Sequence, residues 1–416
     1  MRKITAAALI LAILVSSAVF SACDKINPTT PGDGVETTES TVSEQESVVE
    51  ESKEEISDIS AEPSKPEITK EQLNEVKGML SKYNDIPEFS SDSETISARE
   101  ISSKKKIRLI IDNSNNSFSD LVSRQFKSAA ASAGFKKSVA DKSDGTPAFY
   151  NEQLEKASDS SDVVVMYGDI NKDVVGTTIE KTQAHGVRVL SAGNVGKGES
   201  DHYVDHTIPI NYQLAGQLMA DWTISKNKAK VNALAINNSD STLSTSVYKG
   251  FAEEFQKYVT SGYCTVLSGS SIEAGNGLST KIKEAIDKDP NLNYIVVLDE
   301  SMIADAISGV EQSSNRDLKI VATGGSKEAF GEAETGRIEM LVAQSYEWIA
   351  YAMVDYSLRV LNSSELPKEQ DVPVRVVTAK SIKQSLKENT YDDIDGFYEI
   401  CFGANFVTGY SNLWDL

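Results

Sequence analysis

The sequence is poor in the residues that most enzymes use for metal or nucleophilic chemistry. Its 416 residues include only three histidines and three cysteines. His202 and His206 lie four residues apart, a spacing that could pair them at a metal on a helix, but the Tyr, Val, Ile and Pro around them predict an extended connection. No Gly-x-Ser-x-Gly motif is present, and the isolated cysteines lack a plausible histidine base. We therefore expect no catalytic site, no metal and no cofactor.

Positive charge is also scarce. The 41 lysines and arginines face 62 aspartates and glutamates, giving a formal net charge of −21. This balance argues against nucleic acid or anionic lipid as a partner. After Cys23 only Cys264 and Cys401 remain. On an exported chain they could form a disulfide, or they could be two separate buried thiols.

The first 23 residues have the features of an export signal. Arg2 and Lys3 precede an apolar run, and small residues stand just before Cys23. This ending resembles the lipobox of bacterial lipoproteins, although Phe20 replaces the usual aliphatic residue. The alternatives are an ordinary signal peptide or a membrane-spanning anchor, but the run is short for a span. We expect a signal peptide over 1–22 and a lipidated Cys23 that anchors the protein to the outer face of the bacterial cytoplasmic membrane.

Residues 23–103 have the composition of a tether. The stretch up to about residue 66 is rich in Ser, Thr, Glu and Pro, with almost no aromatic residues. Such a segment buries too little apolar surface to offset its ordering entropy, which predicts a disordered acidic linker. One helix is predicted over 69–83, where Thr69 and Gln72 suit a capping box.

The remaining residues alternate between strand-like and helix-like patterns. Strands that are apolar throughout and separated by helices predict parallel sheets with both faces covered, and so an α/β fold. We distinguish two series, broken around 203–228. The predicted strands are 107–112, 136–141, 162–168, 187–193, 231–237, 265–270, 294–300, 318–325 and 338–345.

Small polar residues follow most of these strands. Ligands bind beyond the carboxyl ends of the strands in open parallel sheets. If the two sheets face one another, these polar ends line a shared cleft that could close on a small ligand. The residues concerned are Asn113 to Asn116, Gly168 and Asp169, Gly193 and Asn194, Asn237 to Ser239, Asp299 to Ser301, and Gly324 to Ser326.

Several stretches in order resemble the type I periplasmic-binding-protein family, the ribose-binding-like proteins that serve sugar ABC importers. They cover about 104–377 and read IIDNSNNSF, AHGVRVLSAGN, INYQLAGQLMADW, VYKGFAEEF, YIVVLDESMIADAISGV and GRIEMLVAQSYEWIAYAMVD. The resemblance implies two Rossmann-like lobes with parallel sheets joined by a multi-crossing hinge. Lobe 1 would take 104–210 and 345–372, and lobe 2 would take 211–344 and 373–416.

The resemblance also implies ligand-binding residues. Asn116 and Phe118 match the family's Asn and aromatic after the first strand, since amides bond hydroxyls and a ring packs on a sugar's C–H face. Alternatively, Asn116 caps the following helix and Phe118 packs inward. The full expected set is Asp112, Asn115, Asn116, Phe118, Asn194, Asn211, Asp299 and Gln344.

The sequence departs from the family at most charged positions. Gly193 and Asn194 stand where the family has Asp-Arg, Asn211 where it has Asp, and Gly324 where it has another Asp. Altered polar residues imply an altered ligand. The expected site has no Arg or Lys to pair with an anionic ligand. A neutral solute is therefore favoured, and we expect a sugar, although an amine-bearing solute would also fit these residues. Asp299 could alternatively serve as a helix cap.

The resemblance therefore predicts a monomeric, non-enzymatic solute-binding lipoprotein that captures a small ligand for an ABC permease. The alternative within the fold is a sensor subunit that signals to a membrane kinase or chemoreceptor. A surface enzyme or adhesion protein is a third reading, which the missing catalytic motifs disfavour. We expect Trp348 to pack in the core, and the aromatic tail 394–416 to dock on a lobe.

Overall fold

The computed structural model describes residues 56–62, 65–112, 116–144, 146–170, 172–193, 201–270, 274–367, 372–388 and 401–416. The signal peptide, Cys23 and the first part of the expected tether lie outside these ranges. Among the helices described, none combines the length and the apolar character needed to cross a bilayer.

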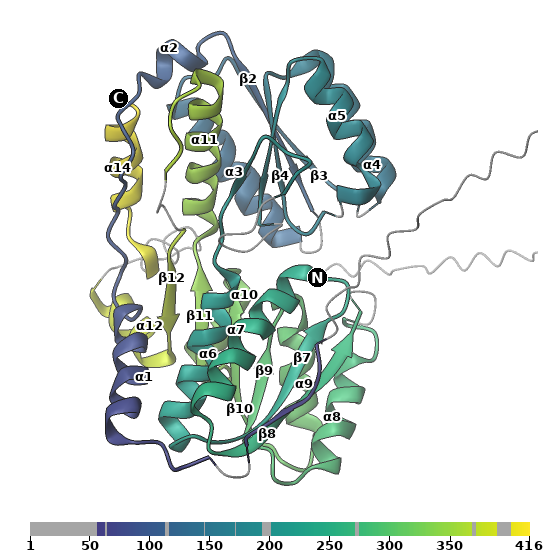
Figure 1. Cartoon of the computed structure of the whole chain (residues 1–416), viewed down its shortest axis with the longest axis vertical. Helices are drawn as coiled ribbons and strands as arrows, with labels where there is room; N and C mark the ends of the chain where they lie inside the picture. Colours follow the sequence, from purple (N-terminus) through teal and green to yellow (C-terminus); the bar gives the residue numbers. More distant parts are fainter. Residues whose placement is uncertain are drawn as a thin grey trace, which may run out of the picture. The chain divides into compact units, whose positions relative to one another are not determined.

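The first lobe is built on a five-stranded parallel sheet. Its inner strands are buried along nearly their whole length because helices cover both faces (Figure 1). The strand order is β3 (Lys137–Lys142), β2 (Lys106–Ile111), β4 (Val163–Tyr167), β5 (Arg188–Ala192) and β6 (His206–Ile208). The helical elements of this part of the chain are α2 (Ala98–Ser102), α3 (Asn116–Ser132), α4 (Pro147–Ser160), η1 (Lys172–Val174) and α5 (Gly176–Ala184).

The second lobe is built on a seven-stranded sheet whose two outermost strands are antiparallel. The order is β1 (Ile59–Ser60), β8 (Ser261–Gly269), β7 (Lys230–Asn238), β9 (Tyr294–Val297), β10 (Lys319–Gly324), β11 (Met340–Gln344) and β12 (Val374–Val377). Its helical elements are α1 (Lys70–Lys82), α6 (Tyr212–Asn227), α7 (Thr242–Tyr258), α8 (Leu278–Lys288), η2 (Glu300–Met302), α9 (Ile303–Gln312), α10 (Lys327–Thr335) and α12 (Ala379–Glu388).

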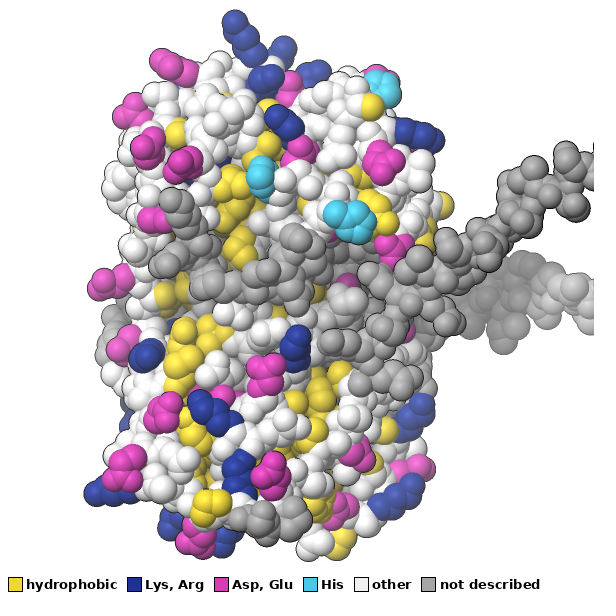
Figure 2. Space-filling view, in the orientation of Figure 1, with side chains coloured by type: hydrophobic (Ala, Val, Ile, Leu, Met, Phe, Trp, Pro, Cys, Tyr) yellow, Lys and Arg dark blue, Asp and Glu magenta, His cyan; other side chains and the backbone are white. Residues whose placement is uncertain are grey.

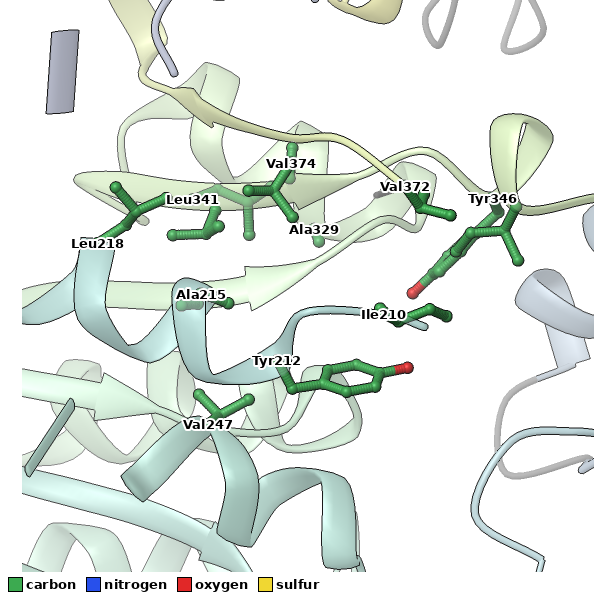
Figure 3. Packing of buried hydrophobic residues seen from close by; sticks show 14 of the residues in the cluster. Ile210, Tyr212, Ala215, Leu218, Val247, Ala329, Leu341, Tyr346, Val372 and Val374 are labelled. Atoms are coloured by element: carbon green, nitrogen blue, oxygen red, sulfur yellow. The ribbon is translucent and has the colours of Figure 1, made fainter. Parts of the chain in front are cut away.

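The chain crosses between the lobes where β6 leads into α6, where β11 leads into α11 (Tyr346–Asn362), and between α11 and β12. Helix α11 packs on α3 and on β4 and β5, and therefore belongs to the first lobe. Figure 3 shows Ile210, Tyr212, Tyr346 and Val372 close together at these crossings, and all four are buried. The predicted fold class is confirmed.

The segment before the first lobe departs from prediction. Helix α1 and its capping box are present, with Thr69 and Gln72 exchanging both hydrogen bonds. However, the expectation of a disordered tether up to residue 103 is wrong from residue 56 onward. Strand β1 pairs with the edge strand β8, and Ile96 and Ala98 are buried. A few apolar residues thus hold the otherwise polar segment 56–103 against the two lobes.

The carboxyl-terminal tail is also placed differently from the prediction. Helix α14 (Asn405–Leu413) packs on α11 of the first lobe, whereas 373–416 was expected on the second. Trp348 is 3% exposed and stacks on Phe406 at 4.8 Å between ring centroids, so the prediction that it packs in the core is confirmed. Cys264 and Cys401 are separate buried thiols, and burial raises the pKa of each to about 12.

Candidate functional site

The carboxyl ends of strands from both lobes meet. Asp169 follows β4 of the first lobe, and its carboxylate accepts hydrogen bonds from the backbone N–H of Thr242 at 2.6 Å and from its hydroxyl at 2.7 Å. Thr242 is the first residue of α7 in the second lobe. The Asp169 carboxylate therefore bonds the amino-terminal end of a helix across the lobe boundary, where the helix dipole favours negative charge.

This bridging carboxylate is partly buried. Burial raises the pKa of Asp169, while the hydrogen bonds from Thr242 and Ser241 lower it and the charge of Asp299 raises it. Burial also raises the pKa of Tyr212, and the charges of Asp169 and Asp299 add to this effect. Residues after β4, after β9 and at the start of α6 thus belong to one electrostatic cluster.

Gly193, at the end of β5, allows a close approach within this cluster. It has a φ of 78°, and a Cβ there would lie 2.9 Å from the Tyr212 hydroxyl and 3.3 Å from the Tyr167 ring. Tyr167 and Tyr212 come from opposite lobes. A larger residue at position 193 would push them apart, so the glycine is needed for the lobes to lie this close.

Glu300 is held by donors from its own lobe and from the start of α11 at the hinge. Its carboxylate accepts hydrogen bonds from the backbone N–H of Gly325 at 2.9 Å and of Ser326 at 2.7 Å, and from the Tyr346 hydroxyl at 2.5 Å. A Cβ at Gly324 would lie 2.8 Å from this carboxyl group. Gly324 stands where the resemblance leads us to expect Asp, and the carboxylate of Glu300 occupies that space instead.

Asp299 caps the helical turn that follows it. One carboxylate oxygen accepts from the N–H and hydroxyl of Ser301, and the other accepts from the Asn238 side-chain amide at 2.9 Å. The cap alternative considered for Asp299 is therefore confirmed. Contact between Asp299 and a ligand stays a prediction.

Gln344 ends β11 and is only 7% exposed. Among the described residues, its side-chain amide has no hydrogen-bond partner. The amide is not one of the fully buried polar groups that lack a partner, so it keeps contact with solvent at the strand end. Gln344 is thus the expected site residue with unused hydrogen-bonding capacity.

The remaining expected residues are spread over two locations. Asp112 follows β2, and its carboxylate accepts a hydrogen bond from the Tyr150 hydroxyl at 3.1 Å. Asn211 instead caps α6 by accepting from the N–H of Leu214 at 3.0 Å. Its surroundings include a groove between α6 and α7, lined with Gln213, Gln217 and Glu253. Asn211 is thereby assigned a capping role.

Part of the expected site cannot be placed. Asn115 and Asn194 lie outside the described residues. Asn116 begins α3, but its side chain and that of Phe118 are not described. Within the described residues, no group of His, Cys, Asp and Glu side chains is arranged to hold a metal ion.

Sequence reasoning did not select the residues that join the lobes. Asp169 and Glu300 were noted as polar strand ends but were not chosen as site residues. Tyr167 and Tyr212 carried no signal, because aromatic residues at helix and strand ends usually face the core. The usable signal was position, because Asp169 and Glu300 lie two and three residues after the end of a buried strand.

A family model described as the periplasmic binding protein domain matches residues 107–365, which include most of both lobes and the meeting strand ends. The chain belongs to the periplasmic binding protein family. Members of this family are binding proteins, and the family implies a location outside the cytoplasm. A search of curated proteins by sequence found no match.

Solved structures of periplasmic binding proteins share this fold. A solute-binding protein from Agrobacterium vitis, bound to α-D-tagatopyranose, has a TM-score of 0.58 and 17% identity over 70% of this chain and 100% of its own. The glucose-galactose binding protein GanP from Geobacillus stearothermophilus has a TM-score of 0.58 and 15% identity over 67% and 99%. A protein from Actinobacillus succinogenes with bound D-allose has a TM-score of 0.57 and 14% identity over 68% and 100%. At these identities the likeness establishes the fold alone.

Proposed function

We propose that this protein captures a small neutral solute, a sugar, between its lobes and delivers it to an ABC permease. The observation that carries the proposal is the bond between Asp169 and Thr242, which brings polar strand ends of both lobes together. A solute that bonds both lobes at once stabilises the closed arrangement without any chemical step. The sugars in the related structures support this class of ligand.

The hydrogen bonds at the site favour a neutral ligand over a cationic one. Asp169, Asp299 and Glu300 each accept bonds from the chain's own N–H or O–H groups. These carboxylate oxygens therefore already have donors from the chain itself, and no ligand cation is needed as their partner. Sugar hydroxyls can both donate to such oxygens and accept from an amide such as that of Gln344.

Outside the cleft, we propose that Cys23 is lipidated and that the protein acts as a monomer at the outer face of the membrane. On the face shown in Figure 2, acidic and basic side chains are interspersed over both lobes. Such a surface offers no large basic patch there for nucleic acid or anionic lipid, which leaves the lipid as the proposed means of anchoring.

The test is a thermal-shift screen of the protein from residue 56 onward against neutral sugars, polyols and amino sugars. A solute that binds only the folded state must raise the melting temperature, by an amount that grows with concentration. We expect a neutral sugar to do so. A shift from amino sugars alone would contradict the neutral class, and no shift from any member would contradict sugar binding.

We predict that Gln344→Ala weakens binding of the sugar found in that screen by about three- to tenfold, the equivalent of one lost hydrogen bond. The melting temperature of the unliganded protein should hardly fall, because this amide has no partner among the described residues. Isothermal titration calorimetry measures the affinity. Gln153→Ala is the matched control, since Gln153 is equally buried but accepts a bond from Arg108 away from the strand ends. Equal losses of affinity in both variants would mean that Gln344 acts through stability.

A further inference from the structure

The chain carries ordered segments that the family domain does not include. The matched domain covers 107–365, and the related structures align over 98–100% of their own length but over only 66–70% of this chain. Residues 83–98 and 401–416 lie outside the matched domain and are described by the structure. We call these two segments together the hinge strap.

One end of the hinge strap is fixed to the second lobe at β12. The N–H of Val376 donates to the carbonyl of Tyr83 at 2.8 Å. The guanidinium of Arg375 donates to the carbonyl of Asn84 at 2.9 Å and to that of Cys401 at 2.6 Å. Arg375 is only 6% exposed. One buried cation of the second lobe therefore holds both segments of the strap.

The other end is fixed to the first lobe at α11. Arg359 of α11 donates to the carbonyl of Glu94 at 3.0 Å. The N–H groups of Ile96 and Ala98 donate to the carbonyls of Leu413 and Trp414 at 2.8 and 3.1 Å. Helix α14 in turn packs on α11. In Figure 1 the first segment runs from α1 past α14 to α2, beside the hinge elements β12 and α11.

Phe89 holds the middle of the strap in place. Its ring lies 4.8 Å from that of Tyr410 and 5.9 Å from that of Trp348, measured between centroids. Gly409 makes room for it, since a Cβ at that position would lie 2.1 Å from the Phe89 ring. The absence of a side chain at 409 is thus what lets the strap lie against α14.

We propose that the hinge strap restrains the movement of the lobes and favours the closed arrangement in the absence of solute. A bend at the hinge changes the distance between β12 and α11, and the strap is fixed to both. No helix or strand lies between Asn84 and Ser97, so this stretch has few internal bonds and depends on its contacts with the lobes. Opening therefore requires the Arg375 bonds to break or Phe89 to leave its position.

The proposal is tested by distance measurement between the lobes without ligand. Spin labels are attached to Glu180→Cys on α5 and Glu284→Cys on α8, both exposed, while Cys264 and Cys401 are buried. Gly409→Ala displaces Phe89, and Gly78→Ala is the control because a Cβ there meets nothing within 4 Å. We expect a single short distance for the parent and for Gly78→Ala, and a longer population for Gly409→Ala.

A second variant covers the case in which Gly409→Ala fails to fold. Residues 90–93 include the exposed Ser90 and Asp92, and can be replaced by a protease recognition sequence that is cut after folding. Cutting should lengthen the distance between the labels, as in Gly409→Ala. Unchanged distances after cutting, with the melting temperature retained, would overturn the proposal. The measurement uses no solute, so its outcome is independent of what the cleft binds.

Discussion

Replacing Asp355 by Ala is expected to destabilise the protein by about 3–5 kcal/mol, because it leaves a buried cation unpaired. Asp355 and Arg359 are 0% and 1% exposed, and their side chains are 2.8 Å apart on successive turns of α11. The other oxygen of Asp355 accepts a hydrogen bond from the Trp414 indole at 2.9 Å. The substitution therefore also leaves the indole N–H without its acceptor. Chemical denaturation measures the free energy of unfolding.

The matched control is Glu152→Ala. Glu152 and Lys156 have the same spacing of four residues on α4, but both side chains are more than half exposed. Losing such a surface pair typically changes stability by less than about 1 kcal/mol. The double variant Asp355→Leu with Arg359→Met should recover much of the loss, since it removes the unpaired charge as well. A double variant that is less stable than Asp355→Ala would contradict this explanation.

The strands of the fold could be predicted because they are buried on both faces. Runs such as Val163–Tyr167 and Tyr294–Val297 are apolar at every position, and no competing pattern fits them. Strands β1, β6 and β12 were not among the predicted strands, and β6 is only three residues long. β1 is two residues long, and β12 contains the charged Arg375, whose burial depends on carbonyl groups distant in sequence. Tertiary hydrogen bonds of this kind leave no local pattern.

The hinge strap was missed for a related reason. Residues 85–103 have linker composition. Their few apolar residues, Phe89, Ile96 and Ala98, make their contacts with segments far away in the sequence, such as Gly409 on α14. Similarly, the bond from Asp169 to Thr242 joins residues 73 positions apart. The strand ends were predictable from topology, whereas the choice of which acidic side chain spans the lobes depends on packing.

Asp221 is a buried acid that faces a second acid, Glu254. It lies on α6, which contacts α7 so closely that a Cβ at Gly216 would lie 1.8 Å from the carbonyl of Val247. Asp221 is 0% exposed, and within the described residues neither carboxyl oxygen accepts a hydrogen bond from an N–H or hydroxyl donor. Burial, followed by the negative charge of Glu254 on α7 and a side-chain hydrogen bond between the two acids, raises the pKa of Asp221 to about 8.

Other charged groups around Asp221 act in opposite directions. Lys257 on α7 lowers its pKa, and Glu75 on α1 raises it. The Lys257 ammonium lies 3.8 Å from Glu254 and 3.9 Å from Glu75, and its side chain is half exposed. The attraction of Lys257 for Asp221 is therefore weakened, because Lys257 also pairs with two other acids and is partly screened by solvent. The neutral acid remains the stable form of Asp221 in the folded protein near neutral pH.

We predict that Asp221→Asn stabilises the protein at pH 8–9 by roughly 2–5 kcal/mol. In the unfolded chain an aspartate loses its proton near pH 4, whereas the folded protein keeps it until about pH 8. Below about pH 4, Asp221 is protonated in both states and does not reduce the free energy of unfolding. As the pH rises from about 4 to about 8, the free energy of unfolding falls by up to 1.4 kcal/mol per pH unit. The isosteric amide carries no charge at any pH, so the variant should lack this loss. Denaturation curves at pH 5, 7 and 9 measure the difference.

The matched substitution Asp305→Asn should have the opposite sign. Asp305 is also buried, but its two carboxylate oxygens accept bonds from the N–H groups of Gly275 at 2.7 Å and Ser279 at 3.2 Å. An amide can accept only through one oxygen, so this variant should lose about 1–2 kcal/mol. If Asp221→Asn instead lowers stability at every pH, its carboxylate must have a donor, and the pH dependence must come from another group. A gain that grows with pH would place the titrating proton on Asp221, because only the ionised aspartate differs in charge from its amide.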